Sequence, residues 1–119
     1  MITFEKVTVE NESVVKEMFK SHSLGEKKVQ YCVKVDDTYI GVIDYSVQEE
    51  RAVLSQLIIH FDYQGYGYGT NTYFTFEEMM KQRNVKEIKV LQEKLTEKAK
   101  SFIESFGFTS EEEEYVKKI

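Results

Sequence analysis

The chain has no proline and no tryptophan, and it has one cysteine, two histidines and six glycines among its 119 residues. A single cysteine, Cys32, excludes an intramolecular disulfide, and with His22 and His60 it lacks the spacing of a metal site. No apolar run approaches the roughly 20 residues that a membrane helix needs. Residues 1–5 lack the basic and then apolar layout of a signal peptide. We therefore expect a cytoplasmic protein that binds no metal and does not enter a membrane.

Basic residues are also few relative to acidic ones. Sixteen Lys and Arg face 21 Asp and Glu, which gives a formal net charge of −5. No basic cluster of the kind that follows a phosphate backbone is present, so we expect no nucleic-acid partner. An acidic surface favours a cationic acceptor. The length predicts one domain, residues 1–119, with a hydrophobic core of its own.

Three of the six glycines stand at alternate positions, 65, 67 and 69. The apolar residues 57–59 before them predict a buried strand, and residues 70–83 after them predict a helix. Glycine is favoured where φ is positive or where the backbone approaches a ligand closely. The unpaired amides and the dipole at a helix start bind anions, so this turn is interpreted as a cradle for a pyrophosphate. The alternative is a turn that only joins the strand to the helix.

The spacing separates this turn from two common phosphate-binding motifs. A nucleotide P-loop ends in Gly-Lys-Ser/Thr, whereas Gly69 is followed by Thr70. The dinucleotide fingerprint needs G-x-G-x-x-G, and the third glycine here comes one position early. What fits is Q-x-x-G-x-G, formed by Gln64, Gly67 and Gly69.

That motif, after a strand that ends at Ile59, resembles the acetyl-CoA-binding motif of the GNAT acyltransferase superfamily. A second landmark of the family is a short helix that leads into Gly-Phe, and residues 99–108 match it. The resemblance implies acetyl-CoA (CoA) as the cofactor, with a backbone N–H near Ile59 as oxyanion donor. It implies that the pantetheine arm pairs with the backbone of a strand formed by Leu57, Ile58 and Ile59. It also places the phosphates on the turn, formed by Gln64, Gly65, Tyr66, Gly67, Tyr68, Gly69 and Thr70.

Periodicity along the rest of the chain predicts the element order β-α-β-β-β-α-β-α-β. The expected strands are residues 2–9, 29–35, 39–47, 52–59, 85–91 and 108–119. The fold class is α/β (α+β), a GNAT-like mixed and mostly antiparallel central sheet with helices on both faces. The family usually has two helices between its first two strands, and about twenty residues here leave room for one helix and a loop over 21–28. This shortness predicts an open cleft or its completion by a second subunit in a homodimer.

A general base must titrate near the working pH or act through water. Histidine does so, which makes His60, next to the end of the predicted strand, the candidate base. Asp44, Glu49, Glu50 and Asp62 are acidic alternatives near the same strand ends. The competing interpretation of His60 is a half-exposed structural residue.

The family's proton donor to the leaving thiolate is a tyrosine in an N-x-x-A-x-x-x-Y context before Gly-Phe. With Ala99 as the anchor, the Asn position holds Thr96 and the Tyr position holds Ile103, which cannot donate a proton. Either another group does this work or the chain is a weak or inactive member. Tyr63 is the candidate acid. The other tyrosines near the turn, each also explained by packing, are Tyr66, Tyr68 and Tyr73.

These residues predict an acetyl-CoA-dependent N-acetyltransferase that moves an acetyl group to a primary amine by direct attack. The acceptor is a small-molecule amine or an amine of a protein. The alternative is a non-catalytic acyl-CoA-binding or regulatory module, and a third is an interaction protein that kept the fold and lost the ligand.

Overall fold

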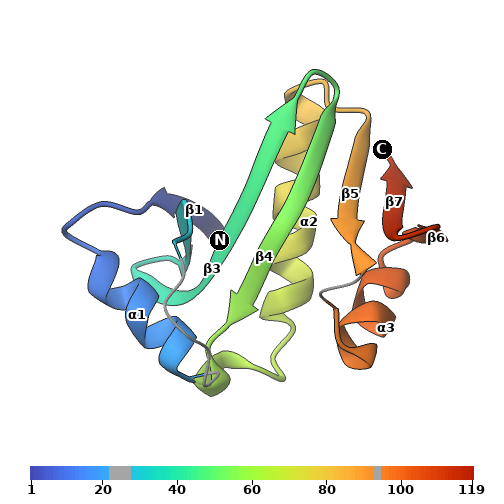
Figure 1. The fold of residues 1–119 in the computed structure, drawn as a ribbon. Coiled ribbons are helices and arrows are strands. Elements are labelled where there is room, and N and C mark those ends of the chain that lie inside the picture. Colours follow the sequence, from blue (N-terminus) through green and yellow to red (C-terminus); the bar gives the residue numbers. More distant parts are fainter. Residues whose placement is uncertain (22–27, 93–94) are drawn as a thin grey trace. The chain divides into compact units, whose positions relative to one another are not determined.

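The computed structural model describes residues 1–21, 28–92 and 95–119, and the predicted loop over 21–28 lies almost wholly outside them. It confirms a mixed α/β fold (Figure 1). The elements in chain order are β1 (Ile2–Lys6), α1 (Glu12–Ser21), β2 (Tyr31–Val35), β3 (Thr38–Gln48), β4 (Arg51–Ile59), the 3₁₀ helix η1 (Phe61–Tyr63), α2 (Tyr68–Gln82), β5 (Glu87–Leu91), α3 (Glu97–Ser105), β6 (Thr109–Glu111) and β7 (Glu114–Lys118).

The strands form one seven-stranded sheet in the order β1-β2-β3-β4-β5-β7-β6. Four neighbouring pairs are antiparallel: β1 with β2, β2 with β3, β5 with β7, and β7 with β6. β4 and β5 pair parallel, from Arg51 opposite Glu87 to Val53 opposite Lys89. The prediction of a mostly antiparallel mixed sheet is therefore confirmed.

The chain divides into two compact units, and the first comprises Met1–Tyr45 and Gln56–Glu78. Its core forms where one face of α1 packs against β2, β3 and the residues that precede β2. The apolar spacing on α1 puts its side chains on this face, as the helical period requires. The buried members are Val15, Met18 and Phe19 of α1 with Val29, Cys32 and Val42.

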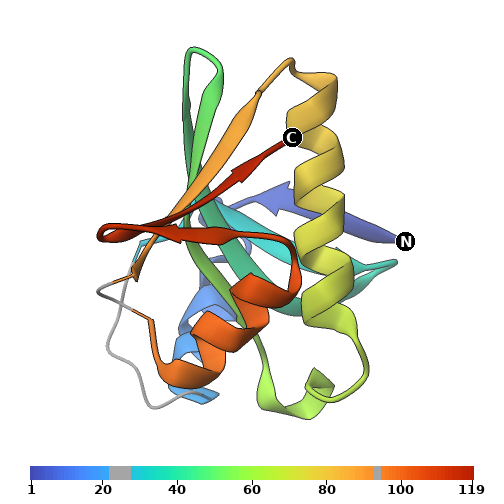
Figure 2. The same ribbon diagram turned by 90° about the vertical axis from the view of Figure 1, so that its right-hand side faces the viewer.

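The second unit comprises Ser46–Ser55 and Met79–Ile119. Figure 2 shows α3 leading into the β6–β7 hairpin, with β7 beside β5. Thr96 caps α3, because its hydroxyl accepts the amide of Ala99 at 3.2 Å, and Gly107 follows the helix end with φ +95°. The buried apolar side chains of this unit include Ile88, Val90, Ile103, Phe106, Phe108, Tyr115 and Val116.

The prediction of a single last strand over 108–119 is wrong, because the chain reverses between β6 and β7. Glu112 occupies the turn with φ +56°, and residues 111–113 are exposed. Three of the four successive glutamates are thus at the hairpin tip, where their like charges remain in water, whereas Glu114 begins β7 and its Oε2 lies 3.1 Å from Lys89 Nζ. β1 is also shorter than predicted. It ends at Lys6 because Asn11 Oδ1 accepts the Thr8 amide at 2.7 Å and turns the chain towards α1.

Candidate functional site

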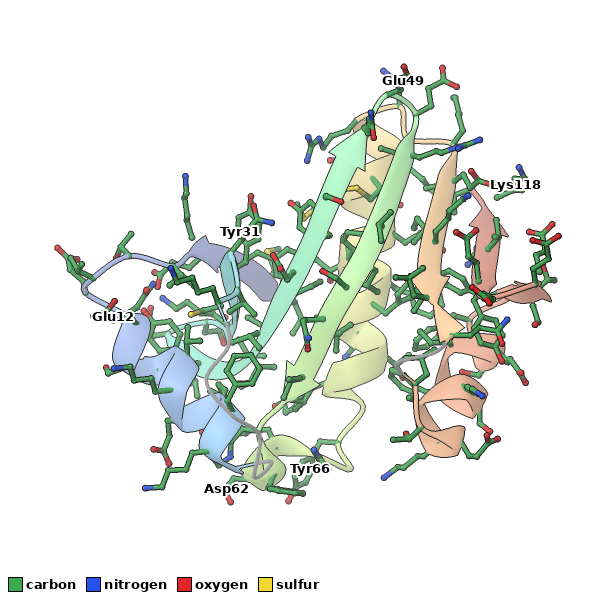
Figure 3. All side chains as sticks on the ribbon, in the orientation of Figure 1. Glu12, Tyr31, Glu49, Asp62, Tyr66 and Lys118 are labelled. Atoms are coloured by element: carbon green, nitrogen blue, oxygen red, sulfur yellow. The ribbon has the colours of Figure 1, made fainter. Side chains whose placement is uncertain are left out.

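The predicted cofactor-binding residues lie in one continuous segment of the first unit, from the end of β4 to the start of α2. β4 ends at Ile59, η1 follows as a single 3₁₀ turn, and α2 begins at Tyr68. Figure 3 labels Asp62 and Tyr66 on the loop that connects them. The predicted order of strand, glycine-rich turn and helix is confirmed, with the helix beginning two residues earlier than expected.

The three glycines of this segment have different local roles. Gly65 and Gly67 adopt φ of +86° and +83°, a conformation that L side chains rarely take. A Cβ built on either one would meet nothing within 4 Å, so the space above both residues is open. Gly69 instead lies in the first turn of α2. Positive φ alone accounts for Gly65 and Gly67, so the turn also satisfies the simple joining alternative, but the open space fits a ligand that approaches the backbone.

The start of α2 provides the donors that an anion needs. The first intrahelical bond runs from the Asn71 amide to the Gly67 carbonyl at 3.0 Å, so the amides of residues 68–70 precede it. Thr70 is exposed in the same turn. These amides, with the positive end of the helix dipole, suit a phosphate group. The residues present therefore fit the nucleotide end of CoA.

Gln64 has a contact that its position in the motif does not reveal. Its side-chain amide Nε2 donates to the carbonyl oxygen of Ile59 at 2.9 Å, across η1. Its backbone amide donates to the Phe61 carbonyl at 3.2 Å. Gln64 thus closes the loop onto the last residue of β4 and holds the cradle at a fixed distance from the strand.

A second supporting residue is Gly41 in β3. The register of β2 and β3 passes from Val33 opposite Gly41 to Lys34 opposite Tyr39, which leaves Ile40 as the extra residue of a β-bulge. A Cβ on Gly41 would lie 2.1 Å from the carbonyl oxygen of Ile58. Gly41 therefore lets β3 lie against the part of β4 that the cofactor is predicted to use. The sequence signal for this close approach is a glycine inside the predicted strand over 39–47.

His60 caps η1 in the structure. Its Nδ1 accepts the backbone amide of Asp62 at 3.1 Å, so the cap uses the lone pair of this nitrogen. The Asp62 carboxylate Oδ2 lies 3.7 Å from the same nitrogen. The His60 side chain is 16% exposed. The centroid of its ring lies 6.1 Å from that of Tyr63, in a T-shaped arrangement.

The acidic alternatives to His60 are dispersed. Asp44 Oδ1 accepts the side-chain amide of Gln30 at 2.7 Å and its backbone amide at 3.3 Å. Glu49 and Glu50 form the turn before β4, whereas the cradle follows β4, so the expectation that they share a strand end with His60 is wrong. Sequence proximity to β4 could not say which end of the strand each residue occupies.

The tyrosines near the turn divide into one core residue and three at the loop. Tyr73 is fully buried and its hydroxyl donates to Glu77 Oε1 at 2.9 Å; burial, followed by that bond, raises the pKa of this phenol. Tyr63 and Tyr68 are half-buried, and Tyr66 is exposed. Ile103, at the family's tyrosine position, is buried as its apolar helix face predicts.

Other groups of the described residues do not extend the site. Cys32 is fully buried in the core of the first unit, and burial raises its pKa to about 11. Among residues 1–21, 28–92 and 95–119, no group of His, Cys, Asp and Glu side chains has a metal-binding arrangement. Within the same ranges, no helix is long and apolar enough to cross a membrane.

Comparison with known proteins identifies the family. The model of the acetyltransferase (GNAT) family matches residues 3–108. The chain therefore belongs to the GNAT acetyltransferase family. No curated protein sequence matches the chain.

Solved structures share the fold over nearly the whole chain. An acetyltransferase from Thermus thermophilus superimposes with a TM-score of 0.82 at 17% identity, covering 100% of this chain and 97% of that one. PaiA N-acetyltransferase from Thermoplasma acidophilum, in complex with coenzyme A, gives 0.75 at 16% identity, covering 100% and 99%. Arabidopsis thaliana Naa50, in complex with the bisubstrate analogue CoA-Ac-MVNAL, gives 0.67 at 18% identity, covering 97% and 95%. At identities of 16–18%, these similarities show a shared fold and nothing further.

Proposed function

We propose that the chain is an acetyl-CoA-dependent N-acetyltransferase that transfers an acetyl group to a primary amine. The observation that carries the proposal is the turn over 64–67, in which open space lies above two glycines with positive φ, directly before the amides of the first turn of α2. Family membership supplies the chemistry that this geometry suits. In this proposal the turn and the amides of residues 65–70 hold the pyrophosphate of CoA.

The end of β4 holds the rest of the cofactor in this proposal. The pairing of β4 with β5 runs from Arg51 to Val53, and residues 57–59 lie beyond it. Their backbone groups can pair with the amides of a pantetheine arm as an added strand would. The bound cofactor supplies an acetyl thioester, and the chain's own task is to hold it and to exchange protons with the acceptor.

Proton exchange falls to His60 and Tyr63. The lone pair of His60 Nδ1 accepts the Asp62 amide, and the Asp62 carboxylate lies 3.7 Å from the same nitrogen, so in the role of base His60 exchanges this capping bond for the proton of the acceptor. Tyr63 contacts His60 edge to face and is half-buried, which supports the role of acid. Both assignments can be tested by substituting the residue concerned.

The acceptor is an amine of a small molecule or of a protein. One protein with the same fold, Naa50 from Arabidopsis thaliana, has been solved with the bisubstrate analogue CoA-Ac-MVNAL, which supports a peptide amine as one class of acceptor. The formal charge of −5 favours a cationic amine. We propose further that residues 1–119 act as one cytoplasmic domain that forms a homodimer.

One observation favours a second candidate, a CoA-binding module without turnover. Ile103 is buried, and the Thr96 hydroxyl is engaged as the cap of α3. Both residues stand where the family's catalytic pattern has Tyr and Asn, and both have structural roles here. In this second candidate function, the cradle binds CoA and no residue donates a proton to the thiolate.

Calorimetric titration with CoA and acetyl-CoA tests the proposal, with Gly67→Glu as the control. We expect micromolar binding that the control abolishes, because a carboxylate above the cradle repels a phosphate. Amine-dependent release of CoA across a panel of small amines and peptide N-termini then separates the enzyme from the binding module. Absence of binding by the wild-type chain at millimolar CoA would exclude both.

A further inference from the structure

The cradle carries an aromatic ring that the packing of the protein leaves in solvent. Tyr66 is 73% exposed, more than any other aromatic residue in the described ranges. It stands between Gly65 and Gly67, and Figure 3 shows it on the loop before α2. A tyrosine with its ring in water gains little from folding, so packing does not explain this residue.

Tyr66 ends a row of rings along the loop. Its ring centroid lies 6.4 Å from that of Tyr68, which lies 6.4 Å from Tyr63, which in turn lies 6.1 Å from His60. The inner members of this row are half-buried, whereas the outermost ring is exposed. The row therefore supports Tyr66 from one side and leaves aromatic surface open next to the cradle.

The same segment contains no cation. From Ala52 to Met80 the sequence has no Lys and no Arg, although a CoA molecule would bring several negative charges to this turn. Within this segment the pyrophosphate must therefore be held without Lys or Arg, by backbone amides, hydroxyls and side-chain amides. For the base of the nucleotide, the side chains of this loop offer an aromatic face.

We propose that Tyr66 is the residue on which the purine base of the cofactor stacks. The inference rests on the proposed function, because it assigns a residue within the proposed CoA site. Adenine is linked through its ribose to the pyrophosphate. Tyr66 lies between the two glycines proposed to hold the pyrophosphate, so the base can reach its ring. Stacking between a base and an aromatic side chain depends on the flat faces of both and needs no hydrogen bond from the phenol.

Calorimetric titration with three probes separates the base from the phosphates. The probes are CoA, 3′-dephospho-CoA and 4′-phosphopantetheine, of which the last has no nucleotide. For Tyr66→Ala we expect about 5- to 100-fold weaker binding of CoA and of 3′-dephospho-CoA, the range for loss of one stacked base. Binding of 4′-phosphopantetheine should be unchanged. Tyr66→Phe should bind all three as the wild type does.

Phe61 provides the matched control, because it is another exposed aromatic residue of the loop, 57% exposed. Phe61→Ala should bind CoA within about twofold of the wild type. The adenine proton resonances of bound CoA give an independent readout: upfield ring-current shifts in the wild type and in Tyr66→Phe, and their loss in Tyr66→Ala.

Two outcomes would overturn the inference while leaving the proposed function intact. In the first, the wild type binds CoA and Tyr66→Ala binds it equally well. In the second, Tyr66→Ala binds all three probes more weakly and to the same extent. The latter would make Tyr66 a residue that shapes the turn. A wild-type chain that binds no CoA would overturn the proposed function and this inference together.

Discussion

The side-chain amide of Gln64 donates a hydrogen bond of 2.9 Å to the carbonyl oxygen of Ile59, which joins the cradle to the last residue of β4. The glutamine of the motif therefore acts on the protein itself. Because this bond fixes the loop between the strand and the helix, the position of the cradle relative to residues 57–59 depends on one side chain.

Gln64→Ala removes that bond and leaves the Ile59 carbonyl without this donor. We expect a loss of about 1 kcal/mol in the free energy of unfolding. We also expect several-fold weaker CoA binding, because the loop is no longer fixed to β4. Urea denaturation and calorimetry measure the two effects. Gln64→Glu is the sharper comparison: it cannot donate to the carbonyl and adds a negative charge beside the cradle, so it should weaken CoA binding more than Gln64→Ala.

Gly67 allows the two explanations of the glycine turn to be separated. Alanine at its φ of +83° should cost about 1–2 kcal/mol of stability, whereas asparagine tolerates this region better and should cost less. Neither new side chain clashes, since nothing lies within 4 Å of the Cβ position. We expect Gly67→Asn to keep most of the stability and to lose CoA affinity at least tenfold, because its side chain occupies the space above the cradle. Unchanged affinity in Gly67→Asn would favour a turn that only joins two elements.

The sequence predicted the site as far as local chemistry determines it. The alternation of glycines, the strand before them and the helix after them are properties of neighbouring residues, and they identified the cradle. Contacts across the chain were not predictable in the same way. Nothing local shows that Gln64 reaches back to Ile59, or that Gly41 makes room for Ile58. The last strand was mispredicted for a related reason, because four glutamates look the same on a strand edge and at a hairpin tip until pairing determines which they are.

His60 combines a structural and a proposed catalytic role, and one substitution distinguishes them. Asparagine is a good N-cap residue, so His60→Asn should keep the bond to the Asp62 amide and most of the stability. It has no titrating nitrogen, so we expect acetyl transfer to fall by about 10²-fold or more, the size of a general-base contribution. Equal turnover by wild type and His60→Asn would assign His60 to capping alone.

Gly41→Ala tests whether β3 positions the cofactor strand. The new Cβ would lie 2.1 Å from the Ile58 carbonyl oxygen, which belongs to the backbone and cannot rotate away. We expect a loss of about 1–3 kcal/mol in stability, as for other overpacked sites, together with weaker CoA binding. Gly107→Ala is the matched control. It introduces strain at φ +95°, but its Cβ would meet only the Lys117 side chain at 3.5 Å, so it should lower stability without changing CoA affinity.

Glu87 should make the second unit sensitive to acid. Its side chain is 11% exposed and lies 3.0 Å from both Arg51 Nε and Lys118 Nζ. The hydrogen bond from Lys118, and then the charges of Lys118 and Arg51, lower the pKa of Glu87 below its ordinary value of 4.5, although its partial burial opposes this. The unfolded chain therefore takes up the proton first as the pH falls. The stabilisation is present above pH 4.5 and is lost as the pH falls through the lower pKa of the folded state.

Glu87→Gln measures this contribution directly. At pH 7 we expect the variant to be about 1 kcal/mol less stable than the wild type, because both cations are largely exposed and solvent screens the pairs. The difference should shrink as urea denaturation is repeated at pH 5, 4 and 3, since the wild-type carboxyl then becomes neutral as well. Glu78→Gln removes the same charge from an exposed position of α2 and should stay within about 0.5 kcal/mol of the wild type throughout. A gap between Glu87→Gln and the wild type that did not change from pH 7 to pH 3 would contradict an ion-pair origin, because the ion pairs are lost when the wild-type carboxyl is protonated.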